Sequence, residues 1–181
     1  MTRDEALQLL RDADLVLSKA QCDAATTRVA AEIKAALGHT NPLVLAVMGG
    51  ATVFAGQLLP QLDFPLEFDY LHVTRYGDKT HGGALQWRVE PHAPIKGRTV
   101  LVLDDILDEG DTMAAIRDRI NALGAATFHN AVFCEKIIAK AKPIRPDFTG
   151  ISVPSRYVFG YGMDVKGWWR NLPAVYAMKG M

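Results

Sequence analysis

The sequence is poor in cysteine, because only Cys22 and Cys134 occur among its 181 residues and they lie far apart. Disulfide-stabilised small domains and structural zinc sites use closely spaced cysteines, and this chain has no CxxC pair. Both classes are therefore excluded, and we expect two reduced, buried thiols.

Charge of one sign is also lacking, since 20 Lys and Arg residues balance 20 Asp and Glu residues. A neutral chain has no general attraction for nucleic-acid phosphates or for an anionic membrane surface. The sequence contains no apolar run of the length that crosses a bilayer, and residues 1–14 alternate charged with apolar side chains. We expect no nucleic-acid partner, no membrane partner, no signal peptide and a cytoplasmic location.

Helix and strand signals alternate along the middle of the chain. A capping box at Thr2 and Glu5 predicts a helix that runs to about Ser18, and a second helix is predicted from about Asp23 to Leu37. Short apolar runs then predict strands over residues 43–48, 67–74, 85–90, 99–105 and 126–133, with helices over 51–59 and 112–123. Such alternation favours an α/β fold with a mostly parallel central sheet flanked by helices.

The pattern changes after Lys140, where prolines, glycines, Trp168 and Trp169 predict an irregular, aromatic-rich C-terminal subdomain. The chain has no internal repeat or flexible linker, and its length suits one domain. We therefore expect a single domain over residues 1–181. Its core would span about 38–140, and residues from about 141–181 would form a small hood with the N-terminal region.

An acidic cluster follows the most apolar predicted strand. The segment VLVLDDILDEGDT places Asp104 and Asp105 at the carboxyl end of that strand, where substrates of open α/β sheets bind. Gly110 and Thr112 provide a tight turn and a hydroxyl at a helix N-terminus, which suits a phosphate monoester. Paired carboxylates suit the vicinal hydroxyls of a ribose, directly or through magnesium, and Asp108 would lie between ribose and phosphate. The alternative is an acidic turn that only caps the next helix.

This segment resembles the phosphoribosyl pyrophosphate motif of type I phosphoribosyltransferases, in which a hydrophobic strand is followed by two acids and then D-x-G-x-T. The resemblance implies that the segment binds the ribose and the 5-phosphate of phosphoribosyl pyrophosphate, through Asp104, Asp105, Asp108, Glu109, Gly110, Asp111 and Thr112. It also implies a catalytic role for Asp108. Glu109 and Asp111 add two negative charges beside the phosphate, and we expect them to weaken its binding.

The C-terminal third resembles the hypoxanthine-guanine branch of this family, with Lys136 after a strand and then SRYVFGYGMD and WWRNLP. The resemblance implies a purine pocket formed by Ile106, Lys136, Tyr157, Val158 and Asp164. Tyr157 would stack on the purine, and Lys136 would donate to a 6-oxo group, which adenine lacks. Taken singly, Tyr157 is better explained as a core tyrosine, but the shared order and spacing of these residues favours the site.

Two further loops resemble parts of the family's site. VMGG resembles the pyrophosphate loop, so that Met48 and Gly49 would contact pyrophosphate through backbone N–H groups, together with the side chain of Arg170. Many relatives carry lysine in place of Met48. TRYGD resembles the start of the mobile catalytic loop, which implies that Arg75 and Tyr76 form a lid. A plain strand-to-helix turn and a hairpin tip are the alternatives.

The resemblance implies a purine salvage enzyme that transfers the 5-phosphoribosyl group of phosphoribosyl pyrophosphate to N9 of hypoxanthine or guanine, giving IMP or GMP and pyrophosphate. Mg2+ would be held by Asp104, Asp105 and Asp164, and the enzyme would be a homodimer or homotetramer. Asp108 would act as a base near purine N7 or would stabilise the cationic sugar. The alternatives are a xanthine/guanine-preferring relative and a non-catalytic nucleotide-sensing regulator on the same fold. A regulator that binds RNA should show a basic face, whereas this chain is neutral.

Overall fold

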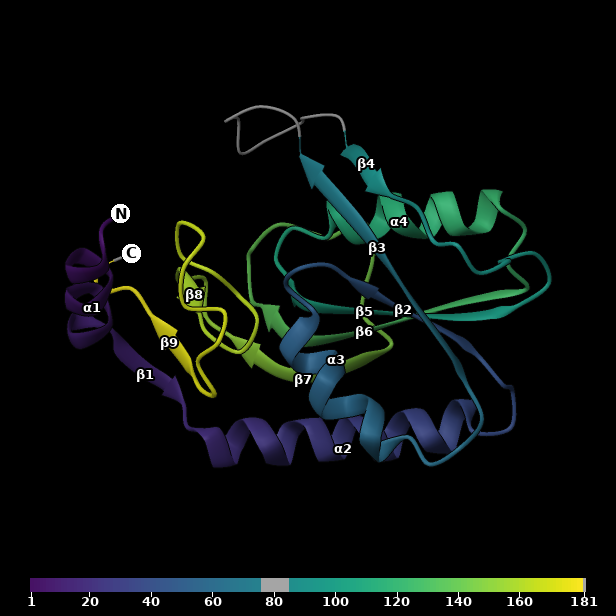
Figure 1. The fold of residues 1–181 in the computed structure, drawn as a ribbon, viewed down its shortest axis with the longest axis horizontal. Coiled ribbons are helices and arrows are strands. Elements are labelled where there is room, and N and C mark those ends of the chain that lie inside the picture. Colours follow the sequence, from purple (N-terminus) through teal and green to yellow (C-terminus); the bar gives the residue numbers. More distant parts are fainter. Residues whose placement is uncertain (76–84, 181) are drawn as a thin grey trace.

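The computed structural model describes residues 1–75 and 85–180, and its main feature is a six-stranded sheet (Figure 1). The strand order is β4-β3-β2-β5-β6-β7. The strands are β2 (Leu43–Val47), β3 (Glu67–Arg75), β4 (Leu85–Val89), β5 (Thr99–Leu107), β6 (Thr127–Lys136) and β7 (Phe148–Val153). Neighbouring strands run parallel except β3 and β4, which are antiparallel. The predicted mostly parallel α/β sheet is therefore confirmed.

Helices cover both faces of this sheet. In Figure 1, α2 (Lys19–Leu37) and α3 (Thr52–Leu58) lie on one side and α4 (Asp111–Ala122) lies on the other, and a short 3-10 turn (Leu59–Gln61) follows α3. Successive strand residues point to opposite faces, so a central strand needs apolar side chains on both. On β5, Leu101 and Leu103 pack in the cluster that includes α2 and α3, while Val100 and Val102 pack in the cluster that includes α4. The continuous apolar run of β5 follows from this burial.

The N-terminal segment differs from the sequence prediction. The capping box at Thr2 and Glu5 is present, but α1 (Arg3–Asp12) ends early and β1 (Asp14–Leu17) follows it. The prediction of one helix to about Ser18 is therefore wrong at its end. β1 pairs with β9 (Val175–Ala177), and this partner is too distant in sequence to affect a local pattern. Ser18 instead caps α2 through a second capping box, so that α2 begins earlier than predicted.

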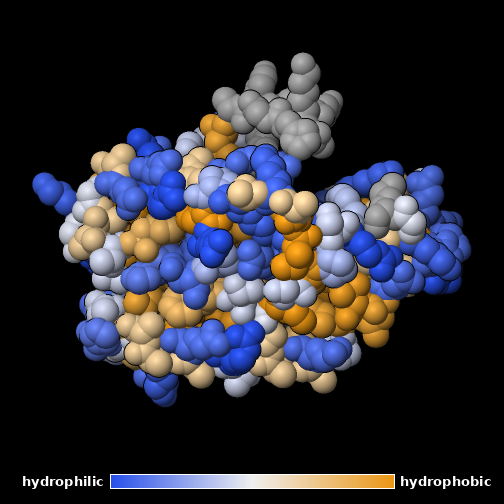
Figure 2. Space-filling view, turned by 180° about the vertical axis from the view of Figure 1, so that it is seen from behind, coloured by the Kyte–Doolittle hydropathy of each residue, from blue (hydrophilic) through white to orange (hydrophobic). Residues whose placement is uncertain are grey.

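A small lobe joins the two ends of the chain. Its sheet has the order β1-β9-β8, where β8 is Val158–Phe159, and α1 lies beside it (Figure 1). Tyr161 fixes this lobe to the core, because its ring centroid lies 4.0 Å from that of Phe133 and its hydroxyl is 2.9 Å from the Thr26 hydroxyl. On the face shown in Figure 2, apolar residues gather between the lobe and the main body. The C-terminal third is thus less irregular than predicted, since β7 also extends the central sheet beyond residue 140.

Both cysteines are buried and outside any disulfide, as expected. Burial raises the pKa of the Cys22 thiol to about 11. In the part of the chain that the structure describes, no helix has the length and apolar character needed to span a membrane.

Candidate active site

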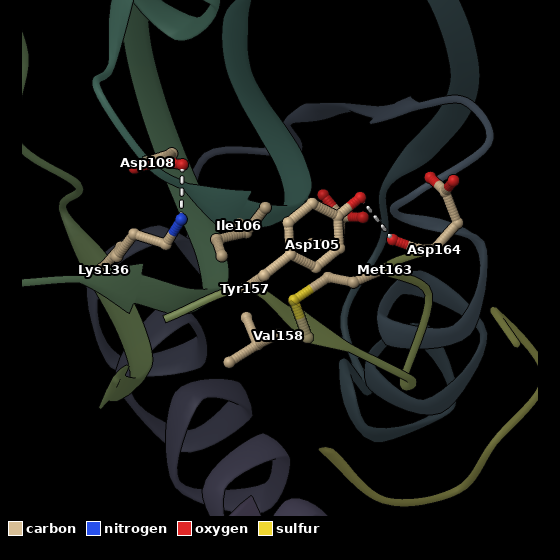
Figure 3. A pocket seen from close by; sticks show the side chains of 8 residues that line it. All are labelled: Asp105, Ile106, Asp108, Lys136, Tyr157, Val158, Met163 and Asp164. Carbon is tan, nitrogen blue, oxygen red and sulfur yellow. Dashed lines mark hydrogen bonds and ion pairs between the residues drawn. The ribbon is translucent and has the colours of Figure 1, made fainter. Parts of the chain in front are cut away.

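A pocket of about 230 Å³ lies where the carboxyl ends of β5 and β6 meet the small lobe. Figure 3 shows the residues that line it, namely Asp105, Ile106, Asp108, Lys136, Tyr157, Val158, Met163 and Asp164. All of these except Met163 are site residues predicted from the sequence. The structure therefore brings together segments that are about 50 residues apart in the chain, and it does so at the edge of the sheet where ligands of open α/β folds bind.

Two buried carboxylates end the apolar part of β5. Asp104 is 9% exposed and Asp105 is 8% exposed, and the backbone N–H of Asp105 donates to Asp104 Oδ1 at 2.9 Å. Burial raises the pKa of Asp104 well above its usual range, and the charge of Asp105 raises it further. Burial also raises the pKa of Asp105, although hydrogen bonding between its side chain and that of Asp104 and the charge of Arg170 oppose the shift. Such a pair is suited to a hydroxyl donor or a cation from a ligand.

The third predicted metal ligand, Asp164, has other partners. Its carboxylate lies 2.5 Å from Arg170 Nη2 and accepts from the N–H of Gly167 at 2.7 Å. Within residues 1–75 and 85–180, no group of three or more His, Cys, Asp or Glu side chains could hold a metal ion by itself. The acidic pair nevertheless fits magnesium, which proteins commonly bind through one or two carboxylates plus substrate phosphates and water.

Asp108 and Lys136 point toward one another across the pocket (Figure 3). Lys136 Nζ donates to Asp108 Oδ2 at 2.6 Å, and the side chains are 15% and 48% exposed respectively. The pairing follows from the sheet, because Leu107 and Glu135 are partners in the β5–β6 register and each precedes one of the two residues. The pocket therefore presents a donor and an acceptor side by side.

Tyr157 forms the aromatic wall of the pocket. Its ring stands between the Lys136–Asp108 pair and Asp164 in Figure 3, and its hydroxyl donates to the main-chain carbonyl of Asp164 at 3.3 Å. Tyr157 stays 43% exposed although it lines a cavity, so part of this residue is accessible to a ligand. An exposed aromatic ring beside a donor and an acceptor is suited to a flat heterocycle.

The loop between β5 and α4 has the conformation that the D-x-G-x-T pattern predicts. Gly110 adopts a φ of +89°, which favours glycine, and α4 begins at the next residue. The N-terminus of this helix directs backbone N–H groups toward the loop, and Thr112 lies in its first turn. Glu109, Asp111 and Thr112 each have a further interaction within the protein.

The loop after β2 lies against both the acidic pair and the small lobe. The Met48–Gly49 peptide bond is cis, and the Thr52 hydroxyl donates to the Gly49 carbonyl at 2.8 Å. A Cβ atom on Gly50 would lie 2.1 Å from Asp105 Oδ2, so only glycine fits this close approach. The Met48 N–H already donates to the Leu71 carbonyl at 2.8 Å, so its predicted contact with pyrophosphate would require that bond to break.

Arg170 links the lobe to the acidic pair. Its Nη1 donates to the Gly162 carbonyl at 2.7 Å and lies 3.9 Å from Asp105 Oδ2. Gly162 in turn contacts the loop after β2, since a Cβ there would lie 2.1 Å from the Gly50 carbonyl oxygen.

Sequence reasoning missed Gly162 and Met163 as site residues, although both stand in the glycine-rich GYGMD segment. The predicted lid begins where Arg75 ends β3 opposite Leu85, and Tyr76 lies outside the described residues.

A mostly parallel sheet with an acidic pair, a D-x-G-x-T loop at a helix N-terminus and an adjoining aromatic pocket is the arrangement that the sequence resemblance to phosphoribosyltransferases implies. The chain belongs to the phosphoribosyl transferase domain family, whose profile matches residues 15–166. It is similar to the hypoxanthine-guanine-xanthine phosphoribosyltransferase of Tritrichomonas foetus, with 35% identity over 152 residues that cover 83% of each chain. The hypoxanthine-guanine phosphoribosyltransferase of Streptococcus pneumoniae R6 is 28% identical over 91% of this chain and 92% of that protein.

A solved hypoxanthine-guanine-xanthine phosphoribosyltransferase structure has the same fold. It superposes with a TM-score of 0.84 and 30% identity, covering 93% of this chain and 99% of that one. The chain also matches the bifunctional protein TilS/HprT of Listeria innocua at 34% identity, where it spans only 23% of the longer protein.

Proposed function

We propose that this protein is a purine salvage enzyme that transfers the 5-phosphoribosyl group of phosphoribosyl pyrophosphate to N9 of hypoxanthine or guanine. The products are IMP or GMP and pyrophosphate. The observation that carries this proposal is the Lys136–Asp108 pair, at 2.6 Å, in a pocket walled by Tyr157. The names of the relatives with similar sequences support the same substrate class.

The pair matches one edge of a 6-oxopurine. Lys136 has only hydrogens to offer and suits the 6-oxo oxygen, while Asp108 accepts a hydrogen from N7. Adenine places an amino group at position 6, so donor would face donor and a largely buried ammonium would lose its partner. Tyr157 stacks on the ring, and the backbone at Val158 bonds to its opposite edge. Asp108 acts as the base at N7 or as the anion beside the cationic sugar.

The sugar phosphate occupies the neighbouring region. Asp104 and Asp105 hold the ribose hydroxyls, and the backbone of residues 109–112 with the Thr112 hydroxyl holds the 5-phosphate. Gly49 and Arg170 contact the pyrophosphate, and residues Arg75 and Tyr76 begin the lid that excludes water. We propose that the enzyme acts in the cytoplasm as a homodimer or homotetramer. A wider pocket specificity that includes xanthine is the second candidate, because the Tritrichomonas relative is named for all three bases.

Magnesium fits the acidic end of β5. When bound, it would neutralise charge on the departing pyrophosphate. Asp104 and Asp105 would hold it, with Asp164 as a third candidate ligand from the small lobe. Asp164 now pairs with Arg170 at 2.5 Å, so Arg170 would exchange that carboxylate for pyrophosphate oxygens when substrate enters.

Base selection by Lys136 provides the test. Steady-state kinetics should show strong use of hypoxanthine and guanine, with little use of adenine. Lys136→Ala should weaken the use of 6-oxopurines by roughly 1–3 kcal/mol and leave the KM for phosphoribosyl pyrophosphate almost unchanged. Lys34→Ala is the control, because Lys34 pairs with Asp63 at 2.5 Å on the surface. Equal use of adenine, or an equal loss with every base, would contradict the proposal.

A further inference from the structure

Lys142 lies in the segment that connects β6 to β7, and its side chain is only 10% exposed. Its ammonium donates to the main-chain carbonyls of Leu107 at 3.2 Å and Lys136 at 2.6 Å. The third partner is the carboxylate of Glu135, at 3.2 Å. An ammonium group has three hydrogens, and each finds one acceptor here. A buried lysine with this set of partners is a structural link between the ends of two strands.

The location of the link gives it a consequence for the pocket. The β5–β6 register ends at Leu107 and Glu135. Beyond this pair β5 ends and β6 pairs only with β7, through Lys136 and Val153. The next residues that line the pocket are Asp108 and Lys136. Where the hydrogen bonds between β5 and β6 end, Lys142 joins the two strands through its bonds to Leu107 and Lys136. These bonds lie next to the two polar groups of the pocket, whose spacing must be fixed.

The aliphatic part of the Lys142 side chain also packs against residues 109–112, the loop proposed to bind the 5-phosphate. A Cβ atom built on Gly110 would lie 3.5 Å from the Lys142 Cβ, and 3.4 Å from atoms of Pro143 and Ile144. The segment that carries Lys142 therefore packs directly under the turn that follows Asp108. Lys142 thus binds the main chain next to Asp108 and at Lys136, and its stem lies close to the turn at Gly110.

We propose that Lys142, charge-balanced by Glu135, is a positioning residue that fixes the spacing of Asp108 and Lys136 and thereby sets the preference for 6-oxopurines. The proposal rests on the function proposed above for the same pocket. Lys142 does not line that pocket and acts only through the carbonyls it binds. Without the ammonium, two carbonyls and a partly buried carboxylate lose their donor, and the strand ends can separate.

A purely structural role is the alternative, and Arg28 offers a matched control. Arg28 donates to the carbonyls of Thr149 at 2.9 Å and Gly150 at 2.5 Å, and it pairs with Glu32 at 2.6 Å. It is thus a second cation that joins two strand carbonyls and one carboxylate, but none of its partners lines the pocket. Arg28→Met should lower the melting temperature and leave the kinetics unchanged.

Lys142→Met should lower the melting temperature and also change base selection. We expect kcat/KM for hypoxanthine to fall between roughly 10- and 100-fold, the range for a small displacement of binding groups. The KM for phosphoribosyl pyrophosphate should change less, and the ratio of hypoxanthine to adenine use should fall. Wild-type kinetics in Lys142→Met, or the same kinetic loss in Arg28→Met, overturns the proposal.

A double variant separates stability from positioning. In Glu135→Met with Lys142→Met, an apolar pair replaces a largely buried ion pair, which often restores stability. The melting temperature should recover, whereas base selection should not, because the carbonyls of Leu107 and Lys136 still lack a donor. Recovery of both together means that Lys142 only stabilises the fold.

Inactivity of the wild-type protein with every 6-oxopurine would refute the proposed function rather than this inference. A crystal structure of Lys142→Met tests the positioning role independently of the proposed function. Loss of the 2.6 Å bond between Lys136 and Asp108 supports positioning, and retention of that bond overturns it.

Discussion

At the scale of single residues, the charge of Asp108 is the feature on which the proposed chemistry depends most. Asp108→Asn keeps the size and one acceptor oxygen but removes the negative charge that would take up a proton or stabilise the sugar cation. We expect kcat to fall roughly 10²-fold or more, with a modest change in KM. Steady-state kinetics at saturating substrates measures this. The matched control is Asp118→Asn, since Asp118 pairs with Arg117 at 2.9 Å on the surface of α4. Turnover near the wild-type value would remove Asp108 from the mechanism.

Local patterns predicted the residues that line the pocket better than the contacts among them. Asp105, Lys136 and Tyr157 each stand in a recognisable segment, and all three line the same pocket. The bond between Lys136 and Asp108 depends on β5 and β6 being neighbours, and strand order is not encoded in either segment. Lys142 is one of several lysines in KIIAKAK, and only its burial in the fold distinguishes it.

At the scale of elements, the turn after β8 is held against the loop after β2 by glycine. Gly162 has a φ of +102°, and an added Cβ would lie 2.1 Å from the Gly50 carbonyl oxygen. Gly162→Ala should therefore push the lobe away from the acidic pair, lower the melting temperature and reduce kcat/KM for both substrates. The control is Gly167→Ala, because Gly167 has a φ of +83° and open space around its Cβ position. Both variants carry the roughly 1–3 kcal/mol of backbone strain, and only the first adds the clash. Equal effects of the two variants would contradict this role of the contact.

Prediction of the elements succeeded where burial is continuous and failed where pairing is distant. β2 and β5 are long apolar runs, because helices cover both of their faces, and both were predicted within two residues at each end. β1 and β9 are short, and each is stabilised by a partner at the other end of the chain. No local period reveals such a pair, so α1 was predicted to continue through β1.

At the scale of the whole molecule, the fold places two carboxylates where burial opposes their charge. Asp104 and Asp105 have pKa values raised above the ordinary 3.8, with burial as the largest cause. The folded protein therefore binds more protons than the unfolded chain at intermediate pH. The stability that these groups contribute is fully present below the unfolded pKa and is lost as the pH rises through the raised folded-state values. The acidic pair that we propose as a binding site thus lowers the stability of the free protein at neutral pH.

Asp104→Asn should consequently stabilise the free protein at pH 7.5 while it impairs catalysis. The amide keeps the oxygen that accepts from the Asp105 N–H, at 2.9 Å, and removes one of two like charges. Each kcal/mol so gained corresponds to roughly 2–4 °C in the melting temperature for a chain of this size. The gain should shrink toward pH 3.8, where the unfolded carboxyl is itself half protonated.

Magnesium with pyrophosphate should raise the melting temperature of the wild type more than that of the Asp104→Asn variant, since the variant has less negative charge to attract the cation. Thermal unfolding across this pH range, with and without magnesium pyrophosphate, measures both effects. A variant that is less stable than the wild type at pH 7.5, or that responds equally to magnesium, would show that the acidic pair is not held under electrostatic strain for the substrate.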